Sequence, residues 1–217
     1  MSEETNNVTA QDGEEFAKAN EKSKKRKAAR DKMLAEKTTG KGLIMVHTGK
    51  GKGKSTAAFG VAVRAIGNGM RVGVVQYVKG AWETGERYVL EKFPELCEIH
   101  TLGEGFTWET QDRARDIAAA ERAWSQTKAM IESCRGEDPA FDVLVLDELN
   151  ISLRYEHLPL DEVIETFKNK PHDLHIIVTG RNAKDEMIEI ADLVTEMTLI
   201  KHPFREQNIK AQRGIEY

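Results

Sequence analysis

The sequence predicts a three-layer α/β fold with a mostly parallel sheet, preceded by a basic N-terminal extension. Two observations support this prediction. Short apolar runs rich in β-branched residues recur through residues 41–217, and longer amphipathic segments separate them. The first apolar run leads directly into a segment rich in glycine and lysine, after which a helical pattern begins. Strands that alternate with helices in this way usually pair in parallel and are covered on both faces.

Composition limits the class of protein. The chain has 217 residues, of which 40% are hydrophobic and 31% charged, as expected for one globular domain with an appendage. The net charge of −4 gives no reason to expect nucleic-acid binding, which depends mainly on Lys and Arg. The acidic, polar start is unlike a signal peptide, and no apolar run approaches the ~18 residues of a membrane span. We therefore expect a cytoplasmic protein, in which Cys97 and Cys134 are packing residues.

Residues 1–40 form the basic extension. Between Glu14 and Lys37 there are nine Lys or Arg and five Asp or Glu, but few large apolar side chains. This composition favours helix, although the segment cannot bury enough apolar surface to be stable alone. Two interpretations remain open: a solvated or disordered tail, or a helix that becomes ordered against a ligand or a partner subunit. An arm that binds nucleic acid is less consistent with the interspersed carboxylates.

The domain that follows, residues 41–217, is predicted to contain six strands and at least four helices. Helices are expected after Lys54, over about residues 110–134, after Pro159 and over about residues 184–192. Apolar residues in the second helix, including Trp124, recur at steps of three and four and are interpreted as core. Because ligands bind beyond the carboxyl ends of parallel strands, functional side chains are expected directly after strands. The predicted strands cover residues 43–47, 72–78, 98–102, 143–147, 174–179 and 194–200.

A phosphate-binding loop is predicted between the first strand and the first helix of this domain. Its glycines permit tight turns and leave backbone N–H groups free to contact phosphate oxygens. The start of the helix adds unpaired N–H groups and the positive end of its dipole. Lys54 is predicted to reach the phosphates, and Ser55 to offer its hydroxyl to Mg²⁺. The predicted nucleotide-binding residues are Thr48, Gly49, Lys50, Gly51, Lys52, Gly53, Lys54, Ser55 and Thr56.

The match to the common phosphate-loop pattern is imperfect, because Thr48 stands where the first glycine is expected. A flexible glycine-rich linker is the alternative. The strand before the loop, the helix after it and the Gly-Lys-Ser sequence at their junction favour nucleotide binding.

A magnesium site is predicted where the fourth strand ends in Asp147 and Glu148. Carboxylates at the carboxyl end of a strand beside a phosphate loop are the expected partners of a hydrated Mg²⁺. The alternative is an acidic pair at a turn or at the start of a helix. Spacing alone does not decide which carboxylate would contact the ion.

Two other loops at strand ends carry candidate ligand contacts. Phe106 and Trp108 flank Thr107 in a glycine-rich segment where neither a helical nor a strand period would bury them. An exposed aromatic pair suggests a surface for a flat apolar ligand, although the loop could instead fold its aromatic side chains onto the core. Arg181 follows the fifth strand and could contact a nucleotide or form a surface ion pair. The sequence offers no pair of nucleophile and base and no histidine pattern typical of a metal site.

Five segments together resemble the P-loop class of ATP:cob(I)alamin (corrinoid) adenosyltransferases. The resemblance covers residues 41–217, and the order and spacing of the segments are more specific than the loop alone. Lys50 stands where the family often has Asn, and Ser55 where it often has Thr. The segments are His47-Thr-Gly-Lys-Gly-Lys-Gly-Lys-Ser-Thr-Ala-Ala-Phe-Gly60, Gly105-Phe-Thr-Trp108, Leu146-Asp-Glu-Leu149, Thr179-Gly-Arg181 and Ala211-Gln-Arg-Gly-Ile-Glu-Tyr217.

The resemblance implies a RecA-like fold, a homodimer and transfer of the 5′-deoxyadenosyl group of ATP to Co(I) of a reduced corrinoid. Because cobalt is then the nucleophile, no catalytic base is needed, and inorganic triphosphate leaves. The resemblance gives Lys54 a role in neutralising the triphosphate and makes Glu148 the direct magnesium ligand. It implies that Phe106 and Trp108 replace the lower axial ligand of the corrinoid, and that Arg181 meets the nucleotide.

The resemblance also suggests that the N-terminal extension covers the corrinoid, and an electron donor such as a reduced flavoprotein is expected. Two alternatives differ in class: an ordinary P-loop kinase or ATPase, and a nucleotide-regulated binding module without catalysis. Release of ADP without dependence on a corrinoid would indicate the first, and ATP binding without turnover the second.

Overall fold

The computed structural model describes residues 10–78, 85–103 and 112–216, and the chain divides into two units, residues 1–40 and 41–217. The first unit contains helix α1 (Ala10–Ala35). Its apolar side chains are few, and Phe16, Met33 and Leu34 are each more than half exposed. Helix α1 therefore depends on its own backbone hydrogen bonds and on its helix-favouring composition.

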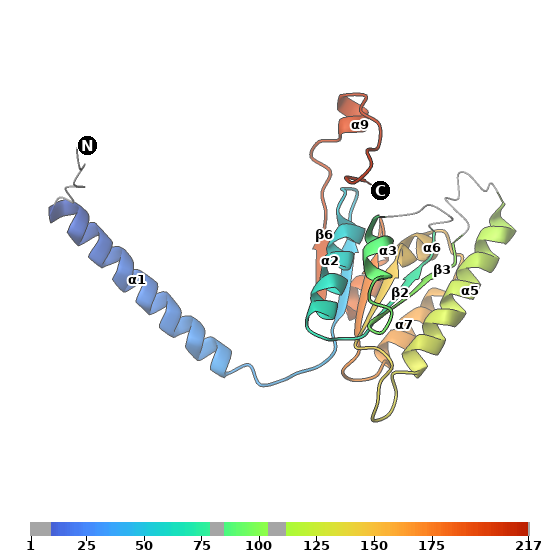
Figure 1. Cartoon of the computed structure of the whole chain (residues 1–217), viewed down its shortest axis with the longest axis horizontal. Helices are drawn as coiled ribbons and strands as arrows, with labels where there is room; N and C mark the ends of the chain where they lie inside the picture. The colour runs from blue at the N-terminus through green and yellow to red at the C-terminus, as the bar shows by residue number, and fades with distance from the viewer. Residues whose placement is uncertain (1–9, 79–84, 104–111, 217) are drawn as a thin grey trace. The chain divides into compact units, whose positions relative to one another are not determined.

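The second unit is built on a six-stranded sheet in the order β3-β2-β4-β5-β1-β6 (Figure 1). All five neighbouring pairs are parallel, which confirms the predicted α/β class. The carboxyl ends of all six strands therefore lie at one edge of the sheet. The strands are β1 (Ile44–Thr48), β2 (Val72–Gln76), β3 (Cys97–Thr101), β4 (Val143–Asp147), β5 (His175–Thr179) and β6 (Leu193–Glu196).

Alternating side chains of the central strands supply two hydrophobic cores, one on each face of the sheet. In β4, for example, Val143 and Val145 belong to one core, whereas Leu144 and Leu146 belong to the other. This period of two is the reason why the central strands read as continuous apolar runs, since both of their faces are buried. Burial of these runs on both faces is the main source of stability for the sheet.

Helices cover both faces and give the three predicted layers (Figure 1). Helix α2 packs Phe59 and Ile66 against one face, and helix α5 packs Trp124 and Ile131 against the other. The burial of Trp124 confirms its interpretation as core, and Cys97 and Cys134 are buried free thiols. The described helices of this unit are α2 (Lys54–Gly67), α3 (Gly85–Leu90), α5 (Arg113–Glu132), α6 (Leu149–Arg154), α7 (Leu160–Lys168), α8 (Asp185–Ile190) and α9 (Pro203–Glu206).

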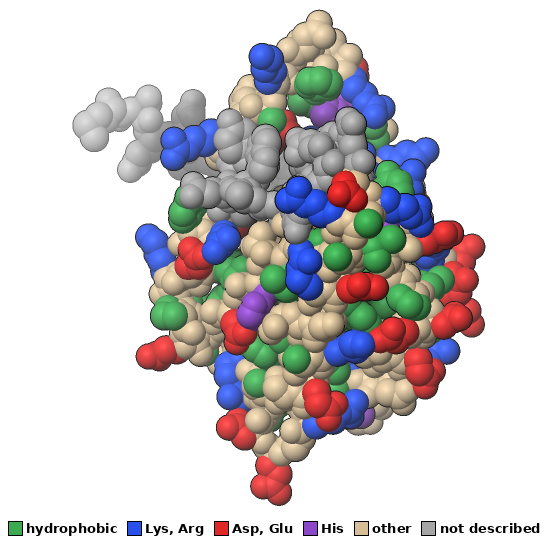
Figure 2. All heavy atoms as spheres, turned by 90° about the vertical axis from the view of Figure 1, so that its right-hand side faces the viewer, with side chains coloured by type: hydrophobic (Ala, Val, Ile, Leu, Met, Phe, Trp, Pro, Cys, Tyr) green, Lys and Arg blue, Asp and Glu red, His purple; other side chains and the backbone are tan. Residues whose placement is uncertain are grey.

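The face formed by α5 and α7 carries acidic and basic side chains interspersed with hydrophobic ones (Figure 2). Glu162 on α7 accepts hydrogen bonds from Trp124 Nε1 at 2.9 Å and from Lys128 Nζ at 2.6 Å, both on α5. The groove between the two helices, of about 360 Å³, is lined by side chains of both helices, mostly from their last turns. Those turns lead into the amino ends of β4 and β5, so this groove lies away from the edge where a ligand of a parallel sheet is expected.

Several details differ from the sequence-based expectation, and β2, expected over residues 72–78, ends at Gln76. The last strand was expected to reach Ile200 but ends at Glu196; the next residue, Met197, donates to the Thr48 carbonyl and accepts from the Gly51 N–H. Pro159 is the N-cap of α7 rather than part of its first turn. Helices α3, α6 and α9 were not expected; each has six residues or fewer, too short to show a helical period. None of the described helices is long and apolar enough to cross a membrane.

Candidate nucleotide-binding site

The loop between β1 and α2 has the backbone geometry of an anion-binding turn. Gly49 and Gly53 have φ values of 95° and 103°, a left-handed region that side chains with a Cβ rarely adopt. Gly53 is the N-cap of α2 and makes no side-chain hydrogen bond to the first turn. The N–H groups that begin α2 therefore have no side-chain cap, and they face the same direction as the positive end of the helix dipole.

Close approach of another segment leaves no room for a Cβ at two of the loop glycines, Gly49 and Gly51, which the sequence did not reveal. A Cβ at Gly49 would lie 2.5 Å from the carbonyl oxygen of Met197, and one at Gly51 would lie 2.7 Å from it. The backbone of Gly51 donates to the Met197 carbonyl at 2.6 Å, and that of Met197 donates to the Thr48 carbonyl at 2.9 Å. The loop is thus clamped against the segment that follows β6.

Lys54 is the buried cation of the site. Its ammonium group donates a hydrogen bond to the carbonyl oxygen of Gly51, within the same loop. Burial lowers the pKa of Lys54, the nearby Glu148 carboxylate opposes this effect, and the charges of Arg181 and Lys52 lower the pKa further. Three cations and one carboxylate, contributed by three different strand ends, are therefore close enough to influence one another.

Asp147 lies at the centre of a buried chain of hydrogen bonds that crosses four strand ends. Its carboxylate accepts from Thr179 Oγ1 at 2.8 Å and from Gln76 Nε2 at 3.4 Å. Gln76 in turn accepts from Thr101 Oγ1 at 2.8 Å. Asp147 is fully buried, so these partners hold its carboxylate in one orientation.

Glu148 differs from its neighbour in exposure and in backbone shape. It has a φ of 65°, uncommon for a residue with a side chain, and its N–H donates to Thr179 Oγ1 at 2.9 Å. Its side chain is only partly buried and reaches Lys54 electrostatically. Gly180, with a φ of 126°, lies so close that an added Cβ would be 3.2 Å from Glu148 Oε2. The chain therefore directs Glu148 toward the phosphate loop, whereas Asp147 stays inside the sheet edge.

The other predicted nucleotide contacts differ in accessibility. Thr48 is buried, and its hydroxyl accepts a hydrogen bond from the Ala183 N–H at 3.0 Å, which ties β1 to the segment after Arg181. Ser55 is partly buried at the start of α2, and exposed side chains belong to Lys50, Lys52, Thr56 and Arg181. Phe106 and Trp108 lie outside the described residues, as does the segment 79–84.

Two participants at this edge were missed by the sequence analysis. Gln76 and Thr101 occupy the last positions of β2 and β3, and both join the hydrogen-bond chain around Asp147. For Gln76, a polar residue at the last position of an otherwise apolar strand was the available signal, whereas β3 already contains Glu98 and His100 and gives no such signal for Thr101. The contact of Glu216 with Lys52 could not be foreseen, because 164 residues separate the two in the chain.

The parallel sheet, the glycine-rich turn and the lysine at the start of α2 define a P-loop nucleotide-binding protein of the α/β class. Residues 40–217 match the family model described as ATP:corrinoid adenosyltransferase BtuR/CobO/CobP. The chain belongs to this family, which confirms the resemblance inferred from the five sequence segments.

Relatives with established names agree with the family assignment. A corrinoid adenosyltransferase of Sinorhizobium sp is 57% identical over 198 residues, which cover 90% of each chain. The corrinoid adenosyltransferase of Pseudomonas aeruginosa is 49% identical over 91% of this chain and 94% of its own length. That of Escherichia coli K12 is 43% identical over 86% of this chain and 91% of its own length.

Proposed function

We propose that this chain holds MgATP in the loop between β1 and α2 so that Co(I) of a reduced corrinoid attacks the ribose 5′ carbon and inorganic triphosphate leaves. ATP-dependent adenosyl transfer to a corrinoid is the activity of its family. In this reaction a cobalt–carbon bond forms with the electron pair of Co(I), and the carbon–oxygen bond to the triphosphate breaks.

The observation that carries the proposal is the convergence of Lys54, Glu148 and Arg181 on a glycine turn at the carboxyl edge of the sheet. The departing triphosphate gains negative charge, so the groups that stabilise it must be in place before the reaction. Lys54 is buried, hydrogen-bonded and close to the start of α2. The clamp between Gly51 and Met197 fixes the turn, and so the cation and the N–H groups keep their positions.

The residues present fit a magnesium ion that arrives with the nucleotide. Among the described residues, no group of three or more His, Cys, Asp or Glu side chains could hold a metal ion by itself. Mg²⁺ in nucleotide sites commonly takes one or two protein oxygens and completes its shell with phosphate oxygens and water. We infer that Glu148 and the Ser55 hydroxyl supply those oxygens and that Asp147 acts through its hydrogen-bond chain. When bound, the ion would neutralise charge on the triphosphate.

The corrinoid side of the site follows from the family resemblance. Phe106 and Trp108 are proposed to occupy the lower axial face of the corrinoid, so that cobalt becomes four-coordinate and easier to reduce. Residues 1–40 are proposed to cover the corrinoid. A homodimer, an electron donor such as a reduced flavoprotein and a cytoplasmic location complete the proposal.

The test is an anaerobic reaction of the full chain with MgATP and chemically reduced cob(I)alamin, followed by absorbance and by analysis of the phosphate products. We expect a light-sensitive alkylcobalamin and one inorganic triphosphate for each. Formation of ADP without dependence on cobalamin would instead support a P-loop kinase or ATPase. ATP binding without any product, with cob(I)alamin or with a corrinoid precursor, would rule out the transferase proposal.

The aromatic pair has its own test. Phe106→Ala and Trp108→Ala should lose more activity when the reaction starts from Co(II) and a reductant than when it starts from Co(I). Equal losses in both assays would contradict the axial role.

A further inference from the structure

The C-terminal segment returns to the phosphate loop at two points. Directly after β6, Met197 bonds with the backbones of Thr48 and Gly51, as described above. At the other end of the segment, the Glu216 carboxylate forms an ion pair with Lys52 Nζ, a residue of the loop itself. Figure 1 shows this path: the chain leaves β6, passes through α9 and comes back to end above the sheet near α2.

The ion pair joins groups of unequal exposure. The Lys52 side chain is 50% exposed, whereas the Glu216 side chain is only 17% exposed. The ammonium group of Lys52 is therefore the more accessible partner. The Glu216 carboxylate is positioned by the C-terminal segment around it. Backbone bonds from Ile215 and Glu216 to the carbonyl of Gln212 form the turn that presents this carboxylate.

Charge explains why the loop favours an anion at this position. Burial lowers the pKa of Lys54, and the nearby charges of Arg181 and Lys52 lower it further. Without an anion these cations repel one another, so a carboxylate on Lys52 relieves part of that repulsion. A phosphate oxygen of a nucleotide would relieve the same repulsion, and it offers the same kind of hydrogen-bond acceptor to an ammonium group.

We propose that Glu216 competes within the chain for the triphosphate site: its carboxylate occupies Lys52 when the loop is empty and is displaced when a triphosphate binds. The proposal rests on the proposed function only in that the loop binds a triphosphate. Displacement follows from like charge, because a bound triphosphate and the Glu216 carboxylate cannot share Lys52 without repulsion. Return of Glu216 to Lys52 then favours release of the inorganic triphosphate.

The competition is modest in size, because an ion pair with an exposed partner contributes little. A pair of this kind corresponds to about two- to fivefold in binding. Loss of Lys52 itself removes a charge-assisted contact with a phosphate and should cost about tenfold or more. The two substitutions are therefore expected to act in opposite directions on the same equilibrium.

The experiment is calorimetric titration of the full chain with inorganic triphosphate and, separately, with ATP, both in the presence of Mg²⁺. Glu216→Gln should tighten triphosphate binding about two- to fivefold, and Lys52→Met should weaken it. The double variant should bind like Lys52→Met, since Glu216 has no cation to occupy once Lys52 is gone. Glu137→Gln, which removes an equal charge from the exposed segment before β4, is the matched control and should bind like the parent.

Weaker binding by Glu216→Gln, with an unchanged melting temperature, would overturn the proposal, because Glu216 would then support the site rather than compete for it. Tighter binding that persists to the same degree in the Lys52→Met background would also overturn it. Both results are read from binding alone. A chain that binds triphosphate as expected but forms no alkylcobalamin would therefore refute the transferase proposal and leave the role of Glu216 standing.

Discussion

The two ends of the sheet use charge in opposite ways. At the carboxyl end, burial lowers the pKa of Lys54, and the nearby charges of Arg181 and Lys52 lower it further against the opposing charge of Glu148. At the amino end, Asp192 pairs with Lys41 and also accepts the Ile44 N–H at 2.9 Å. Among the charged groups that act on Lys54 at the carboxyl end, the cations outnumber the carboxylates, so this end favours an added anion such as a phosphate. At the amino end, the charged groups Lys41 and Asp192 neutralise each other within the chain.

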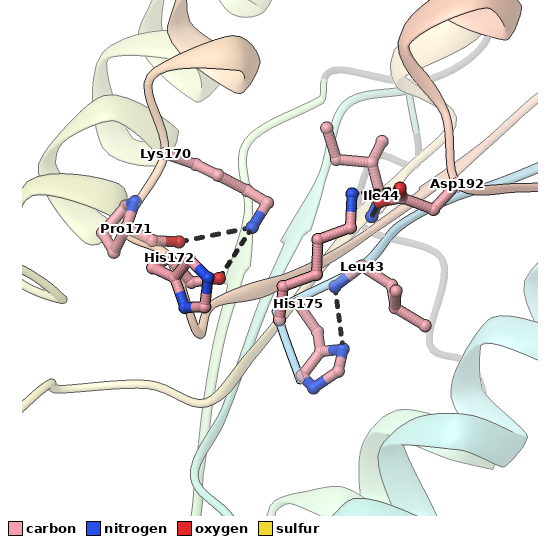
Figure 3. A network of polar contacts seen from close by, with 8 residues as sticks. Leu43, Ile44, Lys170, Pro171, His172, His175 and Asp192 are labelled. Atoms are coloured by element: carbon pink, nitrogen blue, oxygen red, sulfur yellow. Dashed lines mark hydrogen bonds and ion pairs between the residues drawn. The ribbon is translucent and has the colours of Figure 1, made fainter. Parts of the chain in front are cut away.

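Figure 3 shows how the amino end ties the chain together where β1, β5 and β6 begin. The Leu43 N–H donates to His175 Nδ1 at 3.1 Å, next to the Ile44–Asp192 bond. Lys170 Nζ reaches the carbonyl oxygens of Pro171 and His172 at 3.2 and 3.4 Å. Substitutions at the two ends should accordingly separate binding from stability: the carboxyl end should affect nucleotide use first, and the amino end the free energy of unfolding.

The largest effect is expected from Lys54→Ala. The change removes the buried cation, so the developing charge on the triphosphate loses its main side-chain partner. We expect kcat/KM for ATP to fall by about 10²-fold or more in the anaerobic assay. Lys168→Ala, in the exposed last turn of α7, is the control and should behave like the parent. Turnover near the parent value in Lys54→Ala would contradict the phosphate role.

The next effect tests the clamp between the loop and the segment after β6. In Gly51→Ala the added Cβ would lie 2.7 Å from the Met197 carbonyl oxygen, which forces the loop or that segment to move. We expect a loss of about 1–3 kcal/mol in the free energy of unfolding, measured with urea, together with weaker ATP binding.

Gly60→Ala provides the matched comparison. Gly60 lies within α2, and an added Cβ would meet no atom within 4 Å. This change should stabilise the protein by about 0.5–1 kcal/mol, because alanine is the better helix former. If Gly51→Ala were as well tolerated as Gly60→Ala, the contact with Met197 would not determine the shape of the loop.

The sequence predicted features that arise from residues close together in the chain better than features that arise from distant ones. The central strands were found because burial on both faces leaves uninterrupted apolar runs, as in Val143–Asp147. The loop before α2 was found because its glycines and Lys54 are consecutive. Spacing could not separate the roles of Asp147 and Glu148, since that difference arises from Thr179 and from the left-handed backbone of Glu148.

Contacts between distant segments were beyond the sequence pattern. The return of the C-terminal segment to Lys52 depends on the position of β6 beside β1 in the sheet. The hydrophobic pattern of a strand does not reveal which strands lie next to it. Phe106 and Trp108 were singled out by the sequence, and their role stays a prediction because they lie outside the described residues.

A smaller effect is expected at the amino end. Asp192→Ala removes both the ion pair with Lys41 and the acceptor of the Ile44 N–H. We expect a loss of about 1–2 kcal/mol in the free energy of unfolding, with no change in the affinity for ATP. Asp192→Asn keeps an acceptor for Ile44 and should lose less than half as much. A clear loss of ATP affinity in either variant would show that the two ends of the sheet are coupled.

The smallest effect concerns pH and His175. Burial lowers the pKa of His175 below its usual value of 6.5, and the Lys170 charge lowers it further, against the opposing charges of Asp142 and Asp173. Because Nδ1 accepts the Leu43 N–H, the folded chain requires the neutral imidazole. The resulting stability is fully present above the unfolded pKa of about 6.5 and is lost as the pH falls toward the lower pKa of the folded state.

His175→Asn keeps a polar side chain and removes this titration. The urea midpoint of the variant should therefore fall less steeply than that of the parent between about pH 7 and pH 5. Part of the slope should remain, because burial also lowers the pKa of His157 and that residue is unchanged. Identical slopes in parent and variant would mean that protonation of His175 costs the folded state nothing. The hydrogen bond from Leu43 to His175 would then contribute little to stability, and the contacts of Asp192 would be the main stabilising interactions at the amino end.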